Sequence, residues 1–100
     1  MTAACAGKYS GTFDGDLSGA MTGSLDAAGK FTFSFGGEAL GEGSGTVDPD
    51  LTVSGEAHIP TTNVVTATLD GAFDAGQCRL SGGWESLAGD SGGYEFHRTG

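Results

Sequence analysis

Acidic side chains are the most frequent groups able to do chemistry in this chain of 100 residues, which carries 13 Asp and Glu. Asp26, Asp48 and Asp74 each follow an apolar stretch and begin a short segment containing Gly or Pro. An Asp in that position hydrogen-bonds the backbone of its own turn, although oxygen-rich loops also suit Ca²⁺. The sequence has neither a twelve-residue calcium loop nor a GGxGxD repeat. We therefore predict turn-forming carboxylates and no metal site.

Nucleophiles and general bases show no catalytic pattern. Side chains along a β-strand point alternately to its two faces, and His58 and His97 fall at positions that we expect to face outward. Neither histidine has a metal-ligating residue or an orienting acid directly beside it in the sequence. There is no GxSxG nucleophile motif. The glycines between Gly36 and Gly45 lack the helix start or Lys that a phosphate-binding loop requires. We expect no catalytic residue, no cofactor and a protein that is not an enzyme.

Three aromatic residues near the C-terminus are the candidate ligand-binding residues. Trp84, Tyr94 and Phe96 fall at positions of the last two expected strands that should face the apolar interior. They lie on either side of residues 85–92, the connection that we expect to be longest and most mobile. Aromatic side chains at the mouth of a barrel can stack on a small apolar or sugar-like guest. The alternative is that they only fill the core.

The two cysteines, Cys5 and Cys78, are too far apart for a CxxC metal or redox motif. The start of the chain has no basic and apolar signal segment. Met1-Thr2-Ala3-Ala4-Cys5 resembles an initiating Met placed before a mature secreted domain. Since disulfides persist in oxidising compartments, we predict a Cys5–Cys78 bond and a secreted, periplasmic or cell-surface location. Two unpaired buried thiols are the alternative.

The charge of the chain restricts its partners. A net charge of -9 with only 4 Lys and Arg disfavours nucleic acids and anionic membranes, because phosphate binding needs clustered cations. No apolar run approaches the roughly 18 residues of a membrane-spanning helix. The remaining partner classes are another protein or a surface glycan, and a homo-oligomer is compatible with the sequence.

Apolar and polar residues alternate along most of the chain, as in Phe31, Phe33 and Phe35 with Thr32 and Ser34 between them. This period of two indicates antiparallel strands with one wet face. We predict one domain over residues 1–100, with residues 1–7 as an N-terminal extension. The expected strands are residues 8–13, 17–25, 30–36, 39–47, 51–59, 64–73, 77–84 and 92–98, with looser connections at Gly36–Gly41, Pro60–Asn63 and Glu85–Gly92.

An all-β, up-and-down antiparallel meander with no covering helix must bury its apolar face against itself. Glycines recur on the apolar parity and allow sharp coiling, so we predict a closed barrel with its polar face outward, the reverse of a membrane barrel. A β-sandwich is the alternative. In a meander the turns at Asp26, Asp48 and Asp74 share one end with Cys5 and Cys78. A disulfide there would stabilise the fold by roughly 3–4 kcal/mol.

The last two expected strands carry a resemblance to a known family. Gly82-Gly83-Trp84, a turn with a small residue and an acid, and Gly92-Gly93-Tyr94-Glu95-Phe96 resemble the closing hairpin of the transferrin-binding-protein-like β-barrels of bacterial surface lipoproteins. Tyr9-Ser10-Gly11-Thr12-Phe13 and Leu80-Ser81-Gly82 are similar to strands of small secreted bacterial barrels. The turn Ser86-Leu87-Ala88-Gly89-Asp90 lacks that family's Pro and Glu pair. The resemblance implies an eight-stranded barrel on or outside a bacterial cell.

Three functions follow from these features. The first is a non-enzymatic extracellular or cell-surface module that binds another macromolecule through its polar outer face or its loops. The second is a carrier of a small apolar ligand, with a pocket inside the barrel. The third is a secreted inhibitor of a hydrolase that inserts a loop or the N-terminal segment.

Overall fold

Eight β-strands form the protein in a computed structural model that describes residues 3–58 and 64–99. The only helical element in these ranges is one 3₁₀ turn, Ala3–Cys5, within the predicted N-terminal extension. The strands are β1 (Gly7–Gly15), β2 (Gly19–Leu25), β3 (Lys30–Gly37), β4 (Gly41–Val47), β5 (Thr52–His58), β6 (Val65–Asp74), β7 (Arg79–Ser86) and β8 (Ser91–Arg98).

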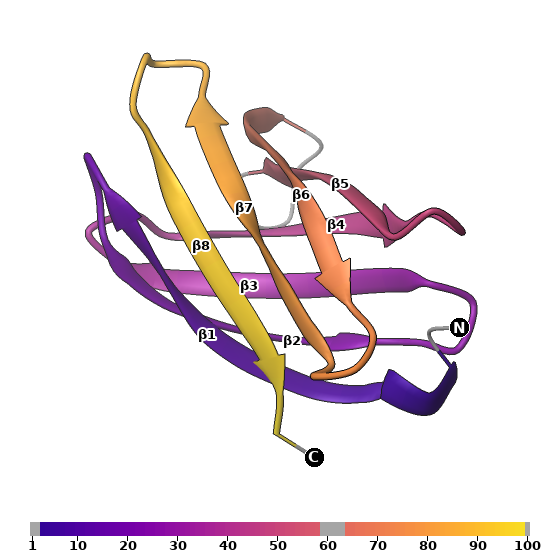
Figure 1. Cartoon of the computed structure of the whole chain (residues 1–100). Coiled ribbons are helices and arrows are strands. Elements are labelled where there is room, and N and C mark those ends of the chain that lie inside the picture. The colour runs from indigo at the N-terminus through magenta and orange to yellow at the C-terminus, as the bar shows by residue number, and fades with distance from the viewer. Residues whose placement is uncertain (1–2, 59–63, 100) are drawn as a thin grey trace.

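The sheet closes on itself. Each strand pairs antiparallel with the next along the chain, and β1 pairs with β8 from Tyr9 opposite Arg98 to Gly15 opposite Gly92. The strands therefore wrap round a single interior (Figure 1). The predicted meander and barrel are confirmed, and the sandwich alternative is wrong.

The connection between β7 and β8 is shorter than expected. β7 continues to Ser86 and β8 begins at Ser91. The Ser86 hydroxyl accepts hydrogen bonds from the backbone N–H groups of Ala88 and Asp90, while Gly89 adopts a φ of 100°. A hydroxyl can replace the usual Asp in such a turn. Because Ser86 stands where the other turns have Asp, the tight hairpin was not recognised from the sequence. Ile59 and the expected connection Pro60–Asn63 lie outside the described residues.

The aromatic row of β3 packs over a row of glycines in the neighbouring strand β4. If these glycines carried a Cβ, each Cβ would meet a ring tip of β3, because the rings occupy the space that side chains on β4 would take. The three distances from such a Cβ to the Phe Cζ are 2.6 Å for Gly41 and Phe35, 2.4 Å for Gly43 and Phe33, and 2.5 Å for Gly45 and Phe31. The glycines thus make room for rings as well as allowing coiling.

The barrel has two different ends. The disulfide end holds the start of β1, the end of β8 and the turns from β2 to β3, β4 to β5 and β6 to β7. The other end, called the mouth below, is where β1, β3, β5 and β7 end and where β2, β4, β6 and β8 begin. This arrangement is the one that the meander predicts.

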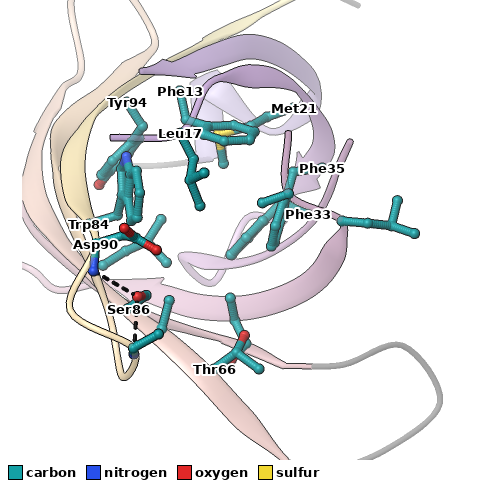
Figure 2. A pocket seen from close by; sticks show the side chains of 16 residues that line it. Phe13, Leu17, Met21, Phe33, Phe35, Thr66, Trp84, Ser86, Asp90 and Tyr94 are labelled. Carbon is teal, nitrogen blue, oxygen red and sulfur yellow. Dashed lines mark hydrogen bonds between the residues drawn. The ribbon is translucent and has the colours of Figure 1, made fainter. Parts of the chain in front are cut away.

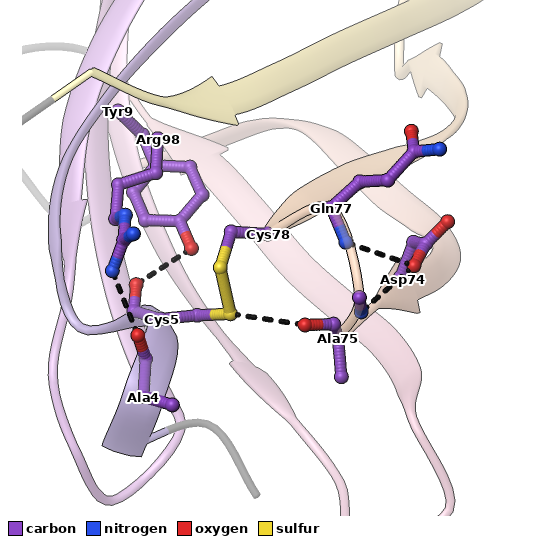
Figure 3. The surroundings of a disulfide bond; sticks show 9 residues. Ala4, Cys5, Tyr9, Asp74, Ala75, Gln77, Cys78 and Arg98 are labelled. Atoms are coloured by element: carbon purple, nitrogen blue, oxygen red, sulfur yellow. Dashed lines mark hydrogen bonds between the residues drawn. A yellow bond between two sulfur atoms is a disulfide. The ribbon is translucent and has the colours of Figure 1, made fainter.

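The predicted disulfide is present and fastens the start of the chain to the barrel (Figure 3). Cys5 and Cys78 are bonded with their Cα atoms 5.3 Å apart. The Tyr9 hydroxyl donates a 2.7 Å hydrogen bond to the Cys5 carbonyl, and the Arg98 guanidinium donates one of 2.7 Å to the Ala4 carbonyl. A disulfide is consistent with an oxidising extracellular environment.

Candidate functional site

A cavity of about 270 Å³ lies inside the mouth of the barrel (Figure 2). Most of its lining residues are apolar, and they come from every strand except β4 and from the connections at this end, which include Leu17 and Leu40. Phe33 and Phe35 form part of the wall from β3, and Trp84 lines it from β7. A concave apolar site with few polar groups is the usual form of a small-ligand pocket.

Small side chains explain why space remains here. Ala57 of β5 and Ala67 of β6 are paired across the two strands, and both line the cavity. A methyl group is too short to reach the opposite wall, so this side of the mouth stays unfilled. The disulfide end is closed instead, because Phe96, Leu80 and Val53 are almost completely buried there and in the barrel centre.

Trp84 is held in place at the mouth. Its indole N–H donates a 3.0 Å hydrogen bond to the Asp14 carbonyl, and its ring meets Phe13 edge to face with 6.1 Å between the ring centroids. The N–H is therefore already used, and what the indole offers to the cavity is apolar ring surface.

The other two predicted aromatic residues differ in position. Tyr94 also lines the cavity, whereas Phe96 is 2% exposed and packs against Tyr9 deeper in the core, with ring centroids 5.9 Å apart. The structure thus brings Trp84 and Tyr94 together and leaves Phe96 outside the cavity wall. A ligand-binding role for these residues stays a prediction.

The Tyr94 hydroxyl is buried and has no hydrogen-bond partner among residues 3–58 and 64–99. Burial, and to a smaller extent the negative charge of Asp70, raises the pKa of Tyr94 to about 12. In an unfolded chain the same group titrates near 10. The folded protein therefore holds this proton more tightly than the unfolded chain does.

A Tyr94→Phe variant is expected to be more stable than the parent by about 1 kcal/mol at pH 7, since it removes an unsatisfied buried hydroxyl. The parent should also lose stability as the pH rises from about 10 to about 12, because the unfolded chain releases the Tyr94 proton first. The variant should lose less over that range. Urea unfolding at pH 8 and at about pH 11 measures both effects, and equal alkaline losses in the two proteins would contradict this account.

The rim of the mouth exposes apolar side chains. Leu40, Val64 and Leu87 are 79%, 57% and 74% exposed, and all three lie in or next to connections at this end. Single exposed apolar residues are normal, but here all three lie at the end of the barrel that holds the apolar cavity, and Leu40 also lines the cavity. The large exposed hydrophobic residues of the described chain thus gather at one end.

Hydrogen bonds hold one side of the rim together. The Asp16 carboxylate accepts a 3.0 Å bond from the Ser91 N–H, and the Asp16 N–H donates to the Ser91 carbonyl at 3.0 Å. Glu38 accepts two bonds from Ser18, from its N–H at 2.9 Å and from its hydroxyl at 3.0 Å. The β1–β2 connection is therefore fixed to both neighbouring connections, which positions Leu17 over the cavity.

Several cavity residues escaped the sequence reasoning. Leu17 was expected inside a strand, but β2 begins only at Gly19, and Leu17 belongs to the preceding connection. Thr66 is a polar residue that lies between Val65 and Ala67. The register between β5 and β6 shifts at Ala57 and His58, and Thr66 lines the cavity. Alternation of residue types carries no signal for a register shift, since the shift depends on how the two strands pair.

The basic side chains are confined to one end of the barrel, whereas acidic side chains lie at both ends. The four cations, Lys8, Lys30, Arg79 and Arg98, all lie at strand ends next to the disulfide end. At the mouth end, the ionisable Asp, Glu, His, Lys and Arg side chains of the described residues are six carboxylates and His58 of β5, whose Nδ1 lies 4.0 Å from a Glu42 oxygen. The acids are Asp14, Asp16, Glu38, Glu42, Glu85 and Asp90.

A second hollow, shallow and polar, lies on the outer face of strands β2 to β5. Its volume is about 620 Å³, and hydroxyl groups line much of it. Two cross-strand hydroxyl pairs, Thr22 with Ser34 and Ser24 with Thr32, lie within it at 3.4 Å. This hollow belongs to the polar outward face that the sequence predicts.

The other candidate residues form no cluster. His97 is exposed on β8, and no group of three or more His, Cys, Asp or Glu in residues 3–58 and 64–99 is arranged to hold a metal ion. The turn carboxylates bind backbone: Asp26 accepts from the N–H groups of Ala28 and Lys30, each at 2.9 Å. No helix in the described part of the chain is long and apolar enough to cross a membrane.

No protein-family model matches this sequence, and no curated protein or solved structure matches the chain. The resemblance to the transferrin-binding-protein-like barrels therefore stays a prediction from the closing hairpin. The site must be judged on its own geometry.

Proposed function

We propose that this protein is a non-enzymatic binding module that takes one small apolar group into the mouth of its barrel. The observation that supports this most is the coincidence of an apolar cavity with the three large exposed apolar side chains at one end of the described chain. Apolar surface left open to water costs free energy, and a bound apolar group would recover it.

The size of the cavity limits the ligand. An engineered cavity of about 150 Å³ holds benzene, and sites for drug-sized ligands span about 300–1,000 Å³. The mouth cavity, at about 270 Å³, lies between these values. A single aromatic ring with a short substituent, or a branched aliphatic group, fits this range.

Titration with 2-phenylethanol tests the proposal, because Trp84 is the single tryptophan and its fluorescence reports on the cavity directly. We expect saturable quenching in the parent protein. Ala67→Leu places three further carbon atoms into the cavity and should weaken binding by at least about tenfold, through loss of space for the ring.

Ala72→Leu is the matched control, since Ala72 lies on the same strand but is exposed on the outer face. This variant should bind like the parent. Equal binding by Ala67→Leu and the parent, or no saturable signal in any of the three proteins, would overturn the proposed function.

A second candidate is binding of a protein or glycan through the polar outer face, supported by the hydroxyl-lined hollow over β2 to β5. Hydroxyl rows can exchange hydrogen bonds with such a partner. Inhibition of a hydrolase by the N-terminal segment has less support, because the disulfide and Arg98 hold Cys5 and Ala4 against the barrel. For either function, the disulfide and the family resemblance favour action outside the cytoplasm, in a secreted, periplasmic or cell-surface setting of a bacterium.

A further inference from the structure

We infer that the ligand of the mouth cavity is a small organic amine, in which a protonated nitrogen is joined to a compact apolar body. The inference rests on the proposed function, since it names the chemical class of ligand for the same cavity. It is carried by Asp90, whose side chain is the only carboxylate or other formally charged group that residues 3–58 and 64–99 contribute to the cavity wall.

Asp90 has a carboxylate that its own turn does not use. In the turn after β2, the Asp26 carboxylate accepts the backbone hydrogen bonds. In the turn after β7, the Ser86 hydroxyl is the acceptor instead, and the Asp90 N–H donates to it at 3.1 Å. The Asp90 carbonyl accepts a 2.7 Å hydrogen bond from the Ser86 N–H. The Asp90 backbone is thus fixed, and its carboxylate has no hydrogen bond or ion pair within residues 3–58 and 64–99.

The carboxylate of Asp90 lies where the apolar cavity meets the solvent, within reach of a group bound in the cavity. Asp90 is half-buried, and Figure 2 shows its oxygens on the Trp84 side of the apolar cavity. A charged group that loses water next to apolar walls is destabilised unless a partner of opposite charge restores the interaction. An ammonium group would do so, and the face of the neighbouring indole also attracts cations.

The charge distribution over the whole molecule favours the same class of ligand. None of the four Lys and Arg lies at the mouth, whereas six carboxylates do, so the potential there is negative. An anionic ligand would be repelled. A neutral ligand would bury Asp90 further without compensating its charge. An amine has a pKa close to that of Lys and is protonated at pH 7.

Three probes with the same phenyl group separate these possibilities: 2-phenylethylamine, 2-phenylethanol and 3-phenylpropionate, titrated against Trp84 fluorescence. We expect the amine to bind roughly tenfold more tightly than the alcohol, since it gains a charge-assisted hydrogen bond. The carboxylate should bind most weakly. Raising the salt concentration to about 0.5 M should weaken the amine and leave the alcohol unchanged.

Asp90→Asn keeps the shape of the side chain and removes its charge. In this variant we expect the amine and the alcohol to bind equally well. Glu85→Gln is the matched control, because it removes one negative charge from an exposed position at the same end that does not line the cavity. It should keep the preference of about tenfold for the amine.

Two results would overturn the amine inference: equal binding of amine and alcohol by the parent protein, or an equal loss of preference in both charge variants. In either case the alcohol would still bind, and the proposed function would stand. Failure of all three probes to bind the parent would instead remove the proposed function and the amine inference with it.

Discussion

Loss of the Cys5–Cys78 disulfide is expected to lower the melting temperature on the order of 15–30 °C. The bond joins residues separated by 73 positions, so it restricts most of the unfolded chain. The chain-entropy model gives about 4 kcal/mol for a loop of this length. In a domain of this size, each kcal/mol corresponds to about 4–8 °C. Thermal unfolding with and without reductant measures the effect.

A Cys5→Ala, Cys78→Gly double variant provides the control for this experiment. Cys78 has a φ of 52°, a left-handed conformation that Gly adopts without strain, so the replacement itself adds no backbone cost. The variant should melt at the temperature of the reduced parent, and reductant should not change it. An unshifted melting temperature in both would show that the barrel does not depend on this bond.

Substitution of Gly43 by Ala is the second change with a large expected effect, a destabilisation of about 2–3 kcal/mol. A Cβ at this position would lie 2.4 Å from Cζ of Phe33 and 2.3 Å from the backbone oxygen of Glu56. The ring can move, but the backbone of β5 is fixed in the sheet, so β4 and β5 would have to separate. Chemical denaturation of the variant and the parent measures the difference.

Gly83→Ala is the matched control in the same experiment. Gly83 lies within β7, and the nearest atoms to a Cβ there are 3.5 and 3.6 Å away, which is ordinary contact. We expect a change within about 0.5 kcal/mol. If Gly43→Ala and Gly83→Ala had equal stability, the packing of β3 rings over β4 glycines would be refuted.

The sheet was largely predictable because its determinants are local. Alternation along segments such as Phe31 to Phe35 fixes which side chains face inward, and Asp26 or Asp74 marks a tight turn. Closure followed because eight strands with one apolar face and no helix have little else to pack against. The shared end of Cys5 and Cys78 then followed from the meander, and the structure has the disulfide there.

The cavity was less predictable because it depends on what distant residues leave unfilled. The alternation along the last two strands correctly predicted that Trp84 and Tyr94 face the interior near the mouth. The same alternation also selected Phe96, which packs in the core and does not line the cavity. Space at the mouth arises where Ala57 meets Ala67, and that meeting depends on the register of β5 and β6. Asp90 was read only as a residue of a mobile loop, since no sequence pattern shows that Ser86 has taken over its turn-forming role.

A crystal structure of the protein with 2-phenylethylamine tests the central claim most directly. The account predicts the phenyl ring inside the mouth, in contact with Trp84 and Phe33, and the ammonium group within hydrogen-bonding distance of the Asp90 carboxylate. A mouth closed by its own side chains, or a ligand found only in the polar hollow over β2 to β5, would contradict it.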